Sequence, residues 1–563
     1  MKNEQTLVEK SSIVQASSPN TKKTKYLEAL LVTVFFFLIW FLLYHFVKGG
    51  PNSSDVSWYF HVGENGIKDS FILNRYFHVF LQKLFISLAD NPLNGFQLFW
   101  SFSIAFASLL IYLSSALLVP QNSRMTGVFA VLLFISQPIM AEVAGIPYVD
   151  VSAMLMLILM VFIYLLSAKA DHQKVIYLVL FGCFLFLGFK TKETVLVVAV
   201  LAIGFAFSKN KFNFVDWVKR LLWVALGLLV GVVVMALLQA IFLKDPFFGF
   251  RISEIKHFME TYFATNASEG RVYISGGWTW NFYKSWMPGL FLLYLLSGIK
   301  LLKKLPINKL IVWAVPLLFI LLLDLSINGK WGWEPRFAFP VLGVLVLLSA
   351  SSLDASLWKT KLDRLLLIGS LVFAVLKQLD IMKMSFSPIN IVLWACLFLF
   401  FIVVSLWSDK IWLRNVSLLL VLLSLLGYAG PKLLDQHNFI EYYETMKPLN
   451  SFKSEIEPEG DTLIFVDIQA VSKGPLPIMK NIDEILVSFN IVYDSNLDRS
   501  NFQIEFDPDN LPEELLLSSA DYYLLSSESY SKLEKSNEFL QKRDDFKLTE
   551  SDDGRFVLLT AIN

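Results

Sequence analysis

The chain has 563 residues, of which 55% are hydrophobic, and its 48 Lys and Arg balance 48 Asp and Glu to give a formal net charge of zero. The mean hydropathy of +0.56 and the long uncharged runs that hold most of the Phe residues exclude a soluble globular protein and indicate a polytopic membrane protein. A balanced charge gives no reason to expect nucleic acid as a partner.

The polar N-terminus (1–25) ends in a group of lysines just before the first apolar run, 26–47. This run is longer than the ~7–15 apolar residues of a signal peptide, and no small-residue cleavage site follows it. We therefore expect an uncleaved anchor with its N-terminus in the cytoplasm, in a multi-pass protein of the cell membrane.

Apolar runs of about 20 residues predict a mainly α transmembrane domain over residues 26–430 with about 13 membrane-spanning helices. The expected spans are 26–47, 95–119, 127–145, 147–168, 174–190, 194–208, 221–243, 287–302, 310–328, 337–353, 365–382, 388–407 and 412–429. Cys183 and Cys396 lie inside two of them, and we expect both to be packing residues.

The distribution of Lys and Arg orients these spans, because cytoplasmic loops are rich in both. One side receives the N-terminal lysines and the basic segments near 124, 169–174, 209–220, 300–309, 359–364 and 410–414. The other side receives the loops 48–94 and 244–286, the turns near 150 and 192, the segment 330–336 and everything after 430. The loops that mix acids, bases and aromatic residues are therefore expected together on the extracytoplasmic face.

Residues 71–93 are amphipathic at helical spacing, which predicts a helix lying along the membrane interface. An ordinary surface helix of an outer loop is the alternative.

After Gly430 the composition becomes polar with a mixed α/β pattern, which predicts a small extracytoplasmic α/β domain over 431–563. Strands are expected at 462–468, 502–506, 521–527 and 555–561, and helices at 476–489 and 529–542. The segment has no phosphate-binding glycine loop, zinc pattern or nucleophile elbow, so we expect a structural or acceptor-docking role.

Two acids at the ends of expected spans are the candidate catalytic residues. Asp55 follows the first span, where a low-dielectric boundary can raise a carboxyl pKa enough for it to act as general base toward an acceptor hydroxyl; a solvated loop aspartate is the alternative. Asp150 begins the fourth span, and ionisable groups at membrane depth are usually functional. Capping of the helix start would equally explain Asp150.

Basic residues on the same face are candidate ligands of a lipid phosphate. Lys192 and Glu193 lie in the outer turn TKE, and Arg336 lies in WEPRF before the tenth span. Phosphate oxygens favour Arg and Lys, although lipid headgroups or snorkelling would explain either cation alone. Lys192 and Arg336 together, on the face of Asp55, favour an anionic lipid ligand.

The loop 244–286 adds Arg251 and His257 as candidate substrate-binding residues. Glu254 and His257 have the i, i+3 spacing of a metal pair, but the sequence offers no second such motif, so we expect no bound metal. The loop's tryptophans are typical of an interfacial aromatic belt, with sugar stacking as the alternative.

Five short segments in this order resemble the GT-C glycosyltransferases, most closely the protein O-mannosyltransferase and aminoarabinose transferase group. They are SSDVSWYF after the first span, NRYFHVFLQKL in the interfacial helix, PYVDVSAML, TKE and RFAFP, and the resemblance covers about residues 26–353.

The resemblance implies transfer of a sugar from a polyprenyl-phosphate carrier to an acceptor protein, lipid or glycan on the extracytoplasmic side. By position, Asp55 matches the family's catalytic acid of the first loop and Asp150 the second acid, near the acceptor. Lys192 matches the lysine after the fifth span, and Arg336 the basic residue before the outer-face proline. Many members have an Asp-Glu pair where this chain has Asp55 alone, which leaves open a contribution from Glu64 or Glu142.

An inverting displacement at the anomeric carbon needs a base for the acceptor hydroxyl and a positive environment for the departing phosphate. The hypothesis gives Asp55 the first task and Lys192 with Arg336 the second, assisted by Arg75 or Arg251. Cations alone can neutralise a monophosphate, so a divalent metal is optional.

The alternative function is a secondary transporter or lipid flippase. Such proteins place ionisable groups near the bilayer midplane, often in two repeated halves, and this sequence shows neither pattern. A plain membrane anchor for the C-terminal domain would not need so many spans.

Overall fold

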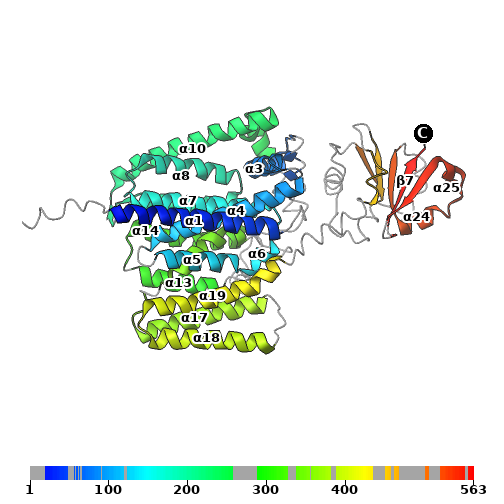
Figure 1. The fold of residues 1–563 in the computed structure, drawn as a ribbon. Helices are drawn as coiled ribbons and strands as arrows, with labels where there is room; N and C mark the ends of the chain where they lie inside the picture. Colours follow the sequence, from blue (N-terminus) through cyan, green and yellow to red (C-terminus); the bar gives the residue numbers. More distant parts are fainter. Residues whose placement is uncertain are drawn as a thin grey trace, which may run out of the picture.

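The structure is a computed structural model, mainly helical with a small sheet near the C-terminus (Figure 1). The described residues are 19–47, 56, 59–60, 62–63, 66, 68–89, 92–119, 123–208, 210–257, 288–302, 304–326, 338–354, 357–381, 388–434, 451–457, 462–467, 501–505, 520–551, 554 and 556–562.

The first part of the chain forms an up-and-down array of helices (Figure 1). It comprises α1 (Pro19–Phe46), the 3-10 turn η1 (Ser70–Ile72), α3 (Tyr76–Ser87), α4 (Pro92–Leu118), α5 (Ser123–Ile135), α6 (Pro138–Glu142), α7 (Val149–Lys169), α8 (Val175–Phe189), η2 (Glu193–Val200), α9 (Leu201–Gly204), the short strands β1 (Phe207–Ser208) and β2 (Lys211–Phe212), α10 (Phe214–Leu243) and η3 (Phe248–Phe250).

The second part continues the array with α13 (Pro288–Leu301), α14 (Ile307–Leu310), η4 (Ile311–Trp313), α15 (Ala314–Ser326), α16 (Phe339–Ser351), α17 (Lys361–Ile381), α18 (Pro388–Trp407) and α19 (Ile411–Leu434). In Figure 1, α3 and α6 lie at one end of the bundle, which we call the α3 end.

Each expected span overlaps at least one of these helices. By length and composition, 4 of the described helices could cross a membrane, namely α4, α7, α10 and the Leu27–Phe46 part of α1. The other apolar helices are shorter, so the number of crossings stays a prediction. The 30 residues of α10 span roughly 45 Å, more than the ~30 Å hydrocarbon core of a bilayer.

Two expected spans have a different local structure. The helix expected over 127–145 is broken between α5 and α6, because Pro138 has no backbone N–H and disfavours helical geometry at Gln137. The Gln137 side chain instead donates to the carbonyl of Leu133, at 2.8 Å. The span expected over 194–208 begins as the 3-10 helix η2, whose TVLVVAV run is rich in β-branched residues.

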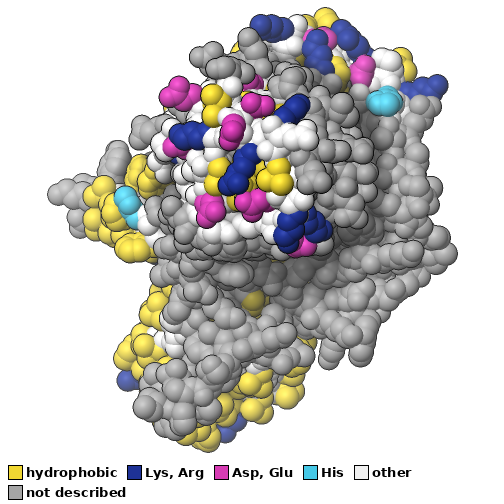
Figure 2. All heavy atoms as spheres, turned by 90° about the vertical axis from the view of Figure 1, so that its right-hand side faces the viewer, with side chains coloured by type: hydrophobic (Ala, Val, Ile, Leu, Met, Phe, Trp, Pro, Cys, Tyr) yellow, Lys and Arg dark blue, Asp and Glu magenta, His cyan; other side chains and the backbone are white. Residues whose placement is uncertain are grey.

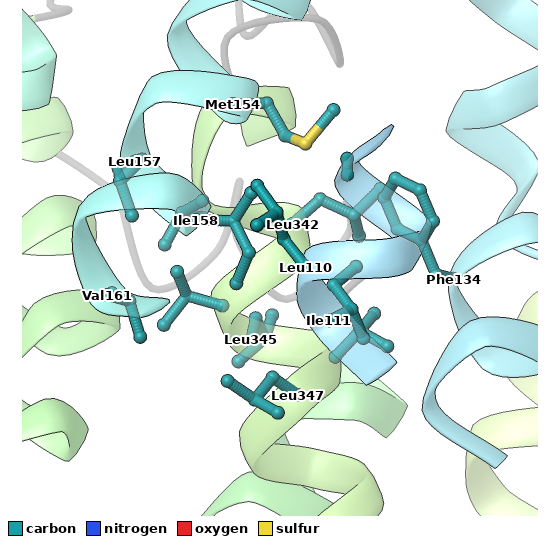
Figure 3. Packing of buried hydrophobic residues seen from close by; sticks show 14 of the residues in the cluster. Leu110, Ile111, Phe134, Met154, Leu157, Ile158, Val161, Leu342, Leu345 and Leu347 are labelled. Atoms are coloured by element: carbon teal, nitrogen blue, oxygen red, sulfur yellow. The ribbon is translucent and has the colours of Figure 1, made fainter. Parts of the chain in front are cut away.

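The buried centre lies between α4, α5, α7 and α16, where large aliphatic side chains interdigitate (Figure 3). Ile111, Phe134, Ile158 and Leu345 from these four helices are all fully buried. In the most apolar window of each helix, 78% of α7 is buried, against 11% of α1 and 22% of α10. Apolar faces of α1 and α10 therefore point outward, as in a protein surrounded by lipid.

Helices α8 and α10 pack closely because a glycine of each helix faces the backbone of the other. A Cβ at Gly182 would overlap the carbonyl oxygen of Val224, and one at Gly227 would overlap that of Val179. Small residues at such contacts allow the backbones of membrane helices to approach each other.

The C-terminal part forms a five-stranded sheet of order β4-β3-β5-β7-β6. Its elements are β3 (Ile464–Asp467), β4 (Phe502–Glu505), β5 (Tyr522–Ser526), α24 (Ser527–Leu533), α25 (Asn537–Lys542), the 3-10 turn η8 (Arg543–Asp545), β6 (Phe546–Glu550) and β7 (Phe556–Ala561). Strands β4, β3 and β5 are parallel, whereas β7 pairs antiparallel with β5 and β6.

Four predicted strands are therefore found, together with β6, which the sequence did not suggest because most of its side chains are exposed. The helix expected over 529–542 is divided, because the Ser536 side chain caps a new helix by accepting from the amide of Phe539 at 3.4 Å. The helix expected over 476–489 lies outside the described residues. The domain boundary near 430 remains a prediction.

Figure 2 views the molecule from the right-hand side of Figure 1. Among the described residues, basic and acidic side chains are intermixed on the facing surface, and hydrophobic side chains gather toward its lower left.

Candidate active site

The turn between α8 and η2, residues Lys190 to Glu193, joins three elements at the α3 end. The backbone carbonyl of Lys190 accepts from the amide of Phe77 at 3.1 Å, which ties the turn to the first turn of α3. The Thr191 side chain donates to the carbonyl of Leu187 at 3.0 Å and so satisfies one of the carbonyls left open at the end of α8. Lys192 then adopts an extended conformation (φ −162°, ψ 134°) directly before η2.

The Lys192 ammonium forms an ion pair with the Asp150 carboxylate, and the two residues are only 8% and 2% exposed. Asp150 lies in the first turn of α7, where the exposed backbone amides favour a negative charge. The carboxylate is thus held by Lys192 as well as by the helix end. The structure therefore brings together two residues that are 42 positions apart in sequence.

The next residue, Glu193, forms a second ion pair with Arg75, which immediately precedes α3. The guanidinium donates from both terminal nitrogens to the two carboxylate oxygens, at 2.5 and 3.2 Å. Burial raises the pKa of Glu193, but the charge and hydrogen bonds of Arg75, with a contribution from Lys192, outweigh it and hold that pKa below its ordinary value.

Asp150, Lys192, Glu193 and Arg75 form one electrostatic unit, the charge quartet. Burial lowers the pKa of Arg75, but Glu193 outweighs this effect, with smaller contributions from neighbours that include Asp150, so the pKa lies above its ordinary value. Two carboxylates and two cations alternate in the quartet. Its formal charges cancel, so it is an ordered polar centre rather than a net positive site.

His78, one turn along α3 from Arg75, contacts the same part of α7. Its Nδ1 lies 2.8 Å from the hydroxyl of Ser152, and the tautomer decides which of the two donates. Burial, and secondarily the charge of Arg75, lower the pKa of His78 to about 3, so the imidazole is neutral at physiological pH.

One described residue of the first loop, Tyr59, lies beside the quartet. The ring of Tyr59 meets that of His78 edge to face at 5.3 Å, and Tyr59 also interacts electrostatically with Arg75. Val56, the residue after Asp55, is fully buried. Asp55 itself, Arg336 and Glu64 lie outside the described residues, as does the side chain of Glu142.

A second ionic group, the Asp245 cluster, follows α10. The buried Asp245 carboxylate forms ion pairs with Arg251 at 2.9 Å and with Lys68 at 3.1 Å. Both cations are about half exposed. Burial raises the pKa of Asp245, but the hydrogen bond from Lys68, the backbone amide of Phe247 and the charge of Arg251 hold it below its ordinary value. Arg251 thus belongs to this cluster and not to the quartet.

Lys190, two residues before Lys192, contacts the segment between Asp245 and Arg251. Its ammonium donates to the carbonyl of Gly249 at 3.1 Å and lies 5.6 Å from the centre of the Phe250 ring. The residue is 4% exposed. No carboxylate among the described residues forms an ion pair with Lys190.

His257 is exposed in the helical segment 252–257, and Glu254 accepts a hydrogen bond from Ser70 at 2.5 Å. In the described part of the chain, no group of three or more His, Cys, Asp and Glu side chains has the arrangement of a metal site. Among the described residues, no hydrogen bond or ion pair joins His257 to the quartet.

The sequence identified the quartet residues but missed His78, Lys190, Asp245 and Lys68. His78 stood inside the NRYFHVFLQKL segment, and Lys190 only two positions before Lys192. A signal for Lys190 did exist, since a lysine directly after an apolar run and before TKE must lie at the same helix end.

Comparison with known structures identifies the fold. ArnT from Cupriavidus metallidurans, in a crystal structure bound to undecaprenyl phosphate, is similar with a TM-score of 0.57 and 12% sequence identity over 95% of this chain and 98% of that one. The apo structure of ArnT gives 0.56, with 11% identity over 96% and 98%.

The AglB oligosaccharyltransferase from Archaeoglobus fulgidus, in complex with an inhibitory peptide and a dolichol-phosphate, reaches 0.48, with 13% identity over 94% of this chain and 74% of that one. The sequence matches no protein-family model and no curated protein. The resemblance to ArnT confirms the GT-C-like fold expected from the sequence.

Proposed function

We propose, on the premise of the fold shared with ArnT, that the chain is a membrane glycosyltransferase. It moves a sugar from a polyprenyl-phosphate-linked donor to an acceptor hydroxyl on the extracytoplasmic face. ArnT has been crystallised with undecaprenyl phosphate, a lipid of the class that such a donor releases. The observation that carries the proposal is the charge quartet, because a buried ion pair and a more exposed one lie together at the end of an apolar bundle where a lipid headgroup would enter.

In this proposal Asp55 is the general base. Its carboxylate accepts the proton of the acceptor hydroxyl while the hydroxyl oxygen forms a bond to the anomeric carbon of the sugar. The bond from that carbon to the phosphate oxygen breaks, and polyprenyl phosphate leaves with the electron pair. Attack opposite to the leaving group inverts the anomeric configuration. Tyr59, which packs on His78 and interacts electrostatically with Arg75, supports this location for the first loop.

Asp150 acts as the second acid by holding Lys192 in place. The quartet is neutral as a whole, so the positive potential for the departing phosphate needs further cations. Lys190 supplies one, and the Asp245 cluster, with two cations and one carboxylate, supplies a second net positive charge. Arg336 and His257 are further candidates for the donor headgroup. At an effective dielectric constant of 20, one such charge about 4 Å from a phosphate is worth ~4 kcal/mol.

The proposal is tested by sugar transfer in membranes that contain the wild-type chain or Asp55→Asn, supplied with a panel of undecaprenyl-phosphate donors carrying a tritiated hexose or pentose. The wild type should label an acceptor, and Asp55→Asn should lose at least ~100-fold of that rate, the lower part of the range for general-base catalysis. Asp363→Asn is the control for loss of an aspartate charge away from the site, because Asp363 in the first turn of α17 pairs with Lys300, on the expected cytoplasmic side. Equal rates for wild type and Asp55→Asn, with both proteins inserted, would remove Asp55 as the base.

A further inference from the structure

The polar contacts around the quartet form a closed circuit through three elements. Arg75 of the α3 N-terminus binds Glu193 of the turn, and the adjacent Lys192 binds Asp150 of α7. Two residues along α7, Ser152 contacts His78, which lies one helical turn from Arg75 on α3. Each element is thus held to the next by a side-chain contact, and the His78–Ser152 contact closes the circuit.

His78 is suited to this task because it is buried and neutral. The residue is fully buried, and Ser152 is 1% exposed. Edge-to-face contacts with Tyr59 at 5.3 Å and Phe99 at 5.7 Å enclose the ring. Among the described residues Nε2 has no hydrogen-bond partner, so the Nδ1 contact with Ser152 is the polar interaction that sets the rotation of the ring.

We propose that His78 is a positioning residue, which fixes the first turn of α7 through Ser152 and thereby holds Asp150 in its pair with Lys192. The inference rests on the proposed function for its effect on transfer, but not for its structural content. Ser152 follows Asp150 by two residues in the same helical turn, so a rotation of this turn would displace both side chains together.

Substitution of His78 by Asn or Gln tests which of the two ring nitrogens is needed. An Asn amide reaches about as far as Nδ1, and a Gln amide about as far as Nε2. We expect His78→Leu, His78→Gln and Ser152→Ala each to lower kcat about 100-fold, the cost of a 1 Å misplacement, with little change in KM for an undecaprenyl-phosphate-linked sugar. His78→Asn should retain most of the wild-type kcat, and His78→Leu with Ser152→Ala should be no slower than either single variant.

Equal rates for His78→Asn and His78→Gln would overturn the inference, because the Ser152 contact would then be irrelevant. Multiplying losses in the double variant would overturn it as well. A lower melting temperature with an unchanged kcat in His78→Leu would show a role in packing alone.

A second measurement needs no substrate and so separates this inference from the proposed function. Melting temperatures in detergent are measured for His78→Leu, Lys192→Met and the combined variant. His78 bonds to Ser152 and Lys192 to Asp150, so the circuit predicts that the losses of stability in the two single variants overlap. The combined variant should therefore melt well above the additive expectation. Additive losses of melting temperature would contradict the circuit. Non-additive losses in a protein that transfers no sugar would contradict the proposed transferase function but not the circuit.

Discussion

Replacing Asp150 with Asn would remove the carboxylate that forms an ion pair with the buried Lys192 ammonium. The two side chains are 3% and 10% exposed, so water cannot replace the lost partner. Removal of one member of such a buried pair typically costs about 3–5 kcal/mol, whereas an exposed pair contributes about 0.2–1 kcal/mol. We therefore expect Asp150→Asn to destabilise the protein by about 3–5 kcal/mol.

Asp150→Asn combined with Lys192→Met removes both charges of the pair, so neither charge remains buried without the other. The double variant should be more stable than Asp150→Asn, with a coupling energy of about 3 kcal/mol, at the upper end of measured couplings between contacting residues. Unfolding by denaturant in detergent micelles, followed through the chain's 15 tryptophans, measures these differences.

Glu28→Gln is the matched control, because the Glu28–Arg124 pair has good geometry but side chains that are 38% and 63% exposed. It should cost less than about 1 kcal/mol. The reasoning is refuted if Asp150→Asn costs as little as Glu28→Gln, or if the losses of the two single variants at the buried pair simply add.

Three further predictions concern separate parts of the chain. The folded-state pKa of Glu193 is lowered from 4.5 to about 2, so its pair with Arg75 stabilises the protein above pH 4.5 and this contribution is lost as pH falls toward 2. The melting temperature of Glu193→Gln should therefore fall less than that of the wild type over this pH range. An acid dependence equal to that of the wild type would contradict the pair. Gly227→Ala should lower the free energy of unfolding by about 1–3 kcal/mol, because its Cβ would push α10 away from α8. Its control is Gly369→Ala, whose Cβ would enter open space; this variant should be neutral or stabilising by up to about 1 kcal/mol in the same unfolding assay. Lys190→Met should raise KM for the lipid-linked donor at least as much as it lowers kcat, and an unaffected KM would exclude a role in holding the donor phosphate.

Much of the membrane architecture could be predicted because hydropathy reports local sequence directly. The expected ranges coincide with helices, and the acids and bases assigned to one face by the positive-inside rule include the quartet residues, which the structure brings together. The break at Pro138 and the 3-10 conformation of η2 were missed because a span of apolar residues has the same hydropathy whether its backbone is continuous or kinked.

The partners of the site residues could not be predicted, because they depend on how distant segments pack. Sequence position gave Arg75 and Arg251 the same role, yet Arg75 pairs with Glu193 and Arg251 with Asp245. His78 was missed for a related reason. A histidine within an amphipathic helix has no distinctive pattern until Ser152 of another helix is seen beside it.

The central claim is that a sugar leaves its polyprenyl phosphate at the α3 end of this bundle. The most direct test is product analysis in sealed proteoliposomes that contain the purified chain, an acceptor extract and undecaprenyl phosphate linked to a tritiated sugar. The account predicts that free undecaprenyl phosphate appears in equal amount to the labelled acceptor, and that Asp55→Asn abolishes both. Intact donor that only changes leaflet, with no release of undecaprenyl phosphate, would contradict the account and indicate a lipid flippase.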